Sequence, residues 1–153
     1  KLTPIDAGLV FLPFTLGVGL LSQPFGALAD KIGARTMLIA GPLGAAAALL
    51  LLALGKDASL APGVIAPMAL LGVSMAGLVA PLTASVMSSV TDADEGLASG
   101  VNNAVSRVAQ LAGIALSAGV ASYASGLIIA AILMTAGALG IALMLPPATG
   151  SKQ

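Results

Sequence analysis

The sequence predicts an all-α membrane protein with five transmembrane helices, and three observations lead to that prediction. Of 153 residues, six are Lys or Arg and six are Asp or Glu, so only 8% are charged. A soluble domain carries about 25% charged residues, which is a much larger share. In addition, 58% of this chain is hydrophobic. The charges also fall in clusters that are separated by long uncharged stretches. Because there is too little charge to cover a water-soluble surface, we expect the lipid bilayer to surround the chain.

Each expected helix comes from one uncharged stretch or from half of one. A transmembrane helix needs about 20 apolar residues, so the first two stretches hold one helix each. In the third stretch, Pro62 and Pro67 place the start of the helix after a short loop. The fourth follows Glu95, is interrupted once by Arg107, and has room for two helices around a turn at 122–126. The expected helices are 7–28, 36–54, 64–89, 97–121 and 127–145.

Composition also excludes several classes of function. The formal net charge is zero, which leaves no basic surface for nucleic acid. Cys and His are both absent, which excludes disulfides, Cys/His metal sites and histidine-based catalysis. We therefore expect no catalytic residues, no metal, no cofactor and no enzymatic activity.

The organisation of the chain indicates a part of something larger. We expect residues 1–153 to form a single transmembrane domain. The chain does not begin with Met, and five is an odd number of spans. Three of the expected helices carry Gly or Ala at close spacing, which is typical of helices that pack together in a membrane bundle.

The segment between the first two helices contains a motif. Residues 26–36 read Gly-Ala-Leu-Ala-Asp-Lys-Ile-Gly-Ala-Arg-Thr. We expect Gly26 to permit close helix contact, Gly33 to supply turn freedom, and Asp30 to cap or pair with a helix N-terminus. The segment resembles the signature loop of the major facilitator superfamily, Gly-x-Leu-Ala-Asp-Arg/Lys-x-Gly-Arg-Lys/Arg. The matching residues are Gly26, Leu28, Asp30, Lys31 and Gly33, while Ala34 replaces a usual basic residue and Arg35 supplies the next one.

Two further stretches, 77–83 and 96–104, look like the late helices of the fourteen-span drug:proton antiporter group within that superfamily. The resemblance implies that the five helices form an incomplete six-helix half of a major-facilitator-type bundle. It implies a conformational-switch loop made by Gly26, Asp30, Lys31, Gly33 and Arg35. It also implies that the missing N-terminal half is the partner, and that small amphipathic molecules or drugs are exported by proton antiport with alternating access.

Charge also predicts the orientation of the chain. Lys31 and Arg35 lie in one short loop, which the positive-inside rule places in the cytoplasm. With five spans, the C-terminus that carries Lys152 then lies on the same side. We expect a multi-pass protein of the cell (inner) membrane with loop 30–35 and the C-terminus in the cytoplasm.

The fourth expected helix carries a polar stripe. Its residues recur every three or four positions, and they are Ser99, Asn103, Ser106, Gln110, Gly113 and Ser117, with Arg107 at the edge. Insertion of a central arginine into lipid costs about 2.5–3.5 kcal/mol, so the stripe faces protein or water. In one interpretation Asn103, Arg107 and Gln110 border the substrate path. In the other, the amides join helices and Arg107 reaches back to the cytoplasmic surface.

A second function stays open at this point: a non-transporting membrane subunit that packs through its Gly-rich faces. The transporter hypothesis also carries a condition. A proton relay in a membrane usually needs a buried carboxylate, and no Asp or Glu lies inside an expected span. If protons drive transport, we expect the acidic residue in the missing half.

Overall fold

The computed structural model describes residues 4–55, 61–91, 93–120 and 122–145. In these residues it contains five long α-helices and no strand, which confirms the all-α class. A short π-helical turn, η2, comes directly before the third long helix. The elements are α1 Pro4–Ile32, α2 Ala34–Leu54, η2 Ala61–Ile65, α3 Ala66–Ser88, α4 Glu95–Ala118 and α5 Tyr123–Met144.

Four of the described helices are long and apolar enough to cross a membrane. Their spans are Gly8–Ile32, Ala34–Leu54, Gly63–Ser88 and Tyr123–Met144. The remaining helix, α4, has 24 residues and hence the length of a span. Its Asn, Gln, Ser and Arg side chains make it the least apolar of the five.

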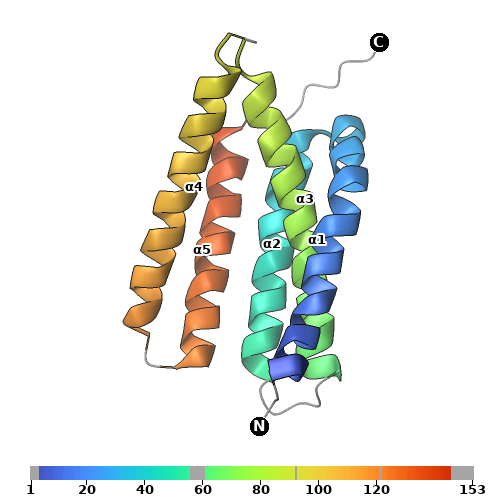
Figure 1. Ribbon diagram of the computed structural model, residues 1–153, viewed down its shortest axis with the longest axis vertical. Helices are drawn as coiled ribbons and strands as arrows, with labels where there is room; N and C mark the ends of the chain where they lie inside the picture. The colour runs from blue at the N-terminus through green and yellow to red at the C-terminus, as the bar shows by residue number, and fades with distance from the viewer. Residues whose placement is uncertain (1–3, 56–60, 92, 121, 146–153) are drawn as a thin grey trace.

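The helices run up and down in sequence order (Figure 1). The α1–α2 turn, the α3–α4 connection and the C-terminal end of α5 lie together at one end of the bundle, and the α4–α5 turn lies at the other. Helix α3 packs against both α1 and α2, and α2 packs against α5. Helix α4 makes its main contact with α3, and that contact is small.

Buried residues concentrate on α2, which packs against both α3 and α5, and one buried cluster lies where α2 meets α5. Ala46 and Leu49 of α2 form an apolar cluster with Ala131 of α5, and Leu71 of α3 packs against it. Lipid gives no hydrophobic drive between helices, so small residues that permit close approach hold such bundles together. The alanines at this interface serve that purpose, and Ala131 retains only 2% of its accessible surface.

The close helix contact that was expected at Gly26 is found elsewhere. A Cβ on Gly26 would meet nothing nearer than the Ala80 Cβ at 4.0 Å, which is an ordinary contact. A Cβ on Gly72 of α3, in contrast, would lie 2.5 Å from the Phe14 carbonyl oxygen of α1. One on Gly17 of α1 would lie 3.0 Å from the Gly72 carbonyl carbon. Glycine is therefore required where α1 and α3 cross, and the assignment of that role to Gly26 was wrong.

Helix α5 begins four residues before the expected start at 127, at Tyr123. Ser122 and Ser125 form a capping box: the Ser122 hydroxyl accepts from the Ser125 amide, and the Ser125 hydroxyl accepts from the Ser122 amide. This reciprocal pair satisfies two amides that a helix start leaves free. The residues that were interpreted as a turn therefore form the first turn of the helix.

Candidate functional site

The connection between α1 and α2 is a single residue, Gly33. Its φ is 90° and its ψ is 133°, a conformation that side-chain-bearing residues rarely adopt. The Gly33 amide donates to the Ala29 carbonyl oxygen at 2.9 Å and so completes α1. The Gly33 carbonyl accepts from the Thr36 amide at 3.2 Å and so begins α2. The structure thus places Gly33 at the turn, in the conformation that was expected of it.

Asp30 and Lys31 lie in the last turn of α1, because that helix continues to Ile32. The sequence interpretation placed both residues in a loop, with Asp30 able to cap the helix that follows. Gly33 is the N-cap of α2, and no side chain caps it. The local capping role for Asp30 is therefore wrong, and both side chains are exposed. A carboxylate near the C-terminus of its own helix is unfavourably placed, since that end carries partial negative charge.

Arg35 lies in the first turn of α2 and points toward a different helix. Its Nη2 donates to the carbonyl oxygen of Ala142, in the last turn of α5, at 2.8 Å. The side chain is half-buried. Its Nε is buried and has no hydrogen-bond partner among the described residues. The five residues of the proposed switch loop are thus split: Asp30 and Lys31 face outward, whereas Arg35 is engaged inside the bundle.

The polar stripe of α4 lies on an open surface. All six of its residues and Arg107 are exposed, and no residue of α4 between Glu95 and Ala118 is buried. Two of the hydroxyls bond within the helix, Ser106 to the Asn102 carbonyl at 2.8 Å and Ser117 to the Ile114 carbonyl at 2.7 Å. The stripe is therefore free to meet something outside the described residues.

The part of α4 that faces α3 was not identified from the sequence. Ala98 and Asn102 are the two half-buried residues of this helix. They lie four residues apart, on a face roughly 100° away from the polar stripe. Asn102 lines a cavity of about 430 Å³ with Val86 of α3 and with Val90, which follows that helix. Ala98, Asn102 and Val105 recur at helical spacing, and this pattern in the sequence could have indicated the face that meets α3.

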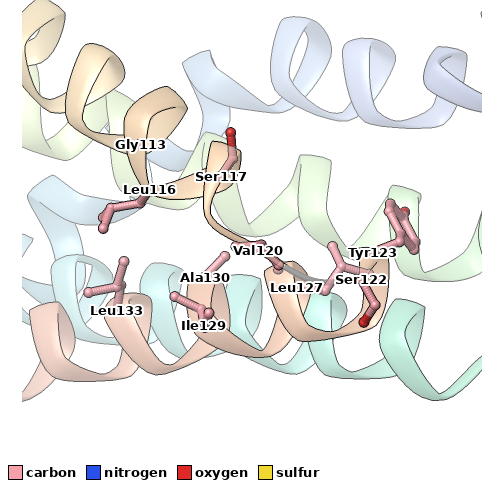
Figure 2. Close-up of a pocket in the computed structure, with 11 residues that line it drawn as sticks. Gly113, Leu116, Ser117, Val120, Ser122, Tyr123, Leu127, Ile129, Ala130 and Leu133 are labelled. Atoms are coloured by element: carbon pink, nitrogen blue, oxygen red, sulfur yellow. The ribbon is translucent and has the colours of Figure 1, made fainter.

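A second cavity, also of about 430 Å³, lies between the ends of α4 and α5 (Figure 2). Its walls are largely apolar, and hydroxyls of Ser117, Ser122 and Tyr123 occur among them. Gly113 and Ser117 bring the end of the polar stripe to this cavity. The lining residues are Gly113, Leu116, Ser117, Val120, Ser122, Tyr123, Gly126, Leu127, Ile129, Ala130 and Leu133. The three expected substrate-path residues, Asn103, Arg107 and Gln110, do not line it.

In the described part of the chain no group of three or more His, Cys, Asp or Glu side chains could hold a metal ion. Apolar walls with a few hydroxyls and amides suit an amphipathic molecule or another helix.

Comparison with known proteins gives one family. The profile of the Major Facilitator Superfamily matches residues 1–153. Multidrug resistance protein Stp of Mycobacterium tuberculosis is 32% identical over 114 residues, which are 74% of this chain and 21% of that protein. Lincomycin resistance protein of Streptomyces lincolnensis is 38% identical over 120 residues, which are 75% of this chain and 24% of that protein. The chain thus spans about a fifth to a quarter of the length of these relatives. No solved structure gives a significant match.

Proposed function

Because the chain belongs to the Major Facilitator Superfamily, we propose that it forms most of the C-terminal half of a secondary active transporter. The proposed transporter exports small amphipathic molecules in exchange for protons, by alternating access between its two halves. Membership confirms the family resemblance of the sequence. It makes the chain part of a multi-pass membrane protein, and it points to transport and away from catalysis.

The observation that carries the proposal is the open polar face of α4. Within a bilayer, a helix with Asn103, Arg107 and Gln110 on one exposed face costs several kcal/mol unless protein or water covers that face. The other described helices pack against one another, whereas α4 has no buried residue. A missing half of the transporter, with a water-filled path between the halves, supplies both protein and water. We therefore place the substrate path along this face.

Asp30 supports the same arrangement. Its carboxylate is exposed at the negative end of α1, so a positive partner from elsewhere would stabilise it. We propose that this partner is the N-terminus of a helix in the missing half, and that the contact closes the cytoplasmic side in one state. Gly26, Lys31 and Gly33 belong to the same switch. In this proposal the α1–α2 turn and the end of α5 lie on the cytoplasmic side of the cell membrane.

The substrate class and the coupling ion are inferred from different observations. The relatives are named for resistance to multiple drugs and to lincomycin, which supports a drug as substrate. That the substrate is small and amphipathic, and that the transporter is of the fourteen-span drug antiporter group, is part of the proposal. The acidic residues of the described helices, Asp6, Asp30 and Glu95, all lie in a first or last turn. We therefore place the proton-coupling carboxylate in the missing half.

A transport assay tests the proposal. The full-length protein is reconstituted into vesicles, a pH gradient is imposed, and uptake of a labelled amphipathic drug is followed. We expect saturable uptake that collapses with the gradient, and none from vesicles that contain residues 1–153 alone. Uptake by that part alone would contradict the two-half proposal. If the full-length protein moves no solute under any gradient, the alternative of a non-transporting membrane subunit is favoured.

A further inference from the structure

In the last turn of α5, the Ala142 carbonyl cannot receive the usual helical hydrogen bond. Within a helix, the carbonyl of residue i accepts from the amide of residue i+4. Leu145 supplies that amide to Ile141 at 2.9 Å. For Ala142 the corresponding residue is Pro146, and proline has no N–H. The Ala142 carbonyl therefore needs a donor from outside its own helix.

We propose that Arg35 is that donor, and that it is a positioning residue that caps α5 and fastens it to α2. Its Nη2 lies 2.8 Å from the Ala142 oxygen, although 107 residues separate the two in sequence. A cation at a helix C-terminus also interacts favourably with the partial negative charge there. Hydrogen bonds from a charged donor are about twice as strong as neutral ones.

The bond adds a polar attachment at the end of α5 to the apolar packing of α2 against α5, which includes the cluster of Ala46, Leu49 and Ala131. Arg35 and Leu49 are 14 positions apart (49 minus 35), which corresponds to roughly 21 Å along α2. Two attachments so far apart keep the helices from separating at one end. We infer that α2 and α5 move as one rigid unit. Within it Arg35 binds the end of α5, while Asp30 and Lys31 remain exposed and available to the other half.

Hydrogen exchange of the full-length protein in detergent tests this cap at its site of action. We expect Arg35→Met to speed exchange of the amides at 141–145 by about tenfold, the factor that corresponds to about 1.4 kcal/mol. Arg35→Lys keeps a charged donor and has no Nε to bury, so we expect exchange within about twofold of the parent. Lys31→Met is the matched control, because it removes a neighbouring exposed cation, and we expect no change at α5.

A second background makes the test independent of how well the Arg35→Met protein folds. Replacing both prolines, Pro146→Ala with Pro147→Ala, gives the chain an amide that can reach Ala142 in a continued helix. In that background we expect Arg35→Met to change exchange by less than about twofold. Exchange of α3 amides in the same samples reports whether the bundle is intact.

Three results would overturn the cap. These are no change at 141–145 in Arg35→Met, an equal increase in Lys31→Met, or a full tenfold increase that persists in the double-alanine background. Hydrogen exchange, and not transport, is the quantity measured. A protein that does not transport could therefore still show the cap, and a result that overturns the cap would not contradict the proposed transport function.

Discussion

Replacement of Gly72 by alanine tests the crossing of α1 and α3. The new Cβ would lie 2.5 Å from the Phe14 carbonyl oxygen and 2.9 Å from the Phe14 Cα. Carbon–oxygen contacts between packed helices are about 3.3–3.6 Å long, so the two helices must separate by roughly 1 Å. An extra methyl group forced into a packed interior costs about 1–3 kcal/mol.

Gly77 of the same helix provides a matched control. A Cβ there would lie 3.8 Å from the Phe25 Cδ1 atom, which is ordinary contact. Both substitutions gain the same helix propensity, about 1 kcal/mol over glycine, so that gain cancels in the comparison. The free energies of unfolding of Gly72→Ala and Gly77→Ala should therefore differ by about 1–3 kcal/mol.

Thermal unfolding in detergent, followed by circular dichroism, measures the difference. For a unit of this size, 1–3 kcal/mol corresponds to about 2–12 °C in the unfolding midpoint, with Gly72→Ala lower. If both variants unfold at the same temperature, the two backbones are not in contact at Gly72, and the packing of α1 on α3 described above is wrong.

Three further predictions concern Gly33, Asp30 and Arg107. Gly33→Ala should lower the free energy of unfolding by about 1–3 kcal/mol, because alanine is strained at a φ of 90°. Gly100→Ala is the control: a Cβ there lies in open space, so it should not lower the free energy measured by the same thermal unfolding. Asp30→Asn should cut vesicle transport about 2- to 10-fold through loss of its partner at a helix end, and unchanged transport would leave Asp30 without a switch role. Arg107→Ala should cut transport about tenfold while Arg107→Lys retains most of it, and survival in both variants would favour the interpretation in which Arg107 only reaches the membrane surface.

The helices could be predicted because the bilayer imposes a simple requirement. An apolar stretch of sufficient length must span the bilayer or pack against other helices. The first three stretches of this chain each hold one long helix, and the fourth holds two. Helix ends were less predictable, since they depend on local hydrogen bonds. Ser122 with Ser125 extended α5 backward, and the Gly33 amide extended α1 forward over Asp30 and Lys31.

Contacts between helices could not be predicted from spacing. The chain has nineteen glycines. Nothing in the local sequence distinguishes Gly72, which touches a neighbouring backbone, from Gly77, which does not. The engagement of Arg35 with Ala142 joins positions far apart in sequence. Only the missing amide of Pro146 hinted that a donor was required there. The polar stripe of α4 was predictable, whereas the α3-facing position of Asn102 was not.

The one-residue joint at Gly33 also bears on how the protein is made. Two spans joined without slack cannot be threaded into a bilayer independently, so α1 and α2 are expected to enter it together as a helical hairpin. These two helices touch each other little and pack chiefly through α3. The hairpin would therefore remain incomplete during synthesis until the third helix emerges from the ribosome and fills the space between its arms.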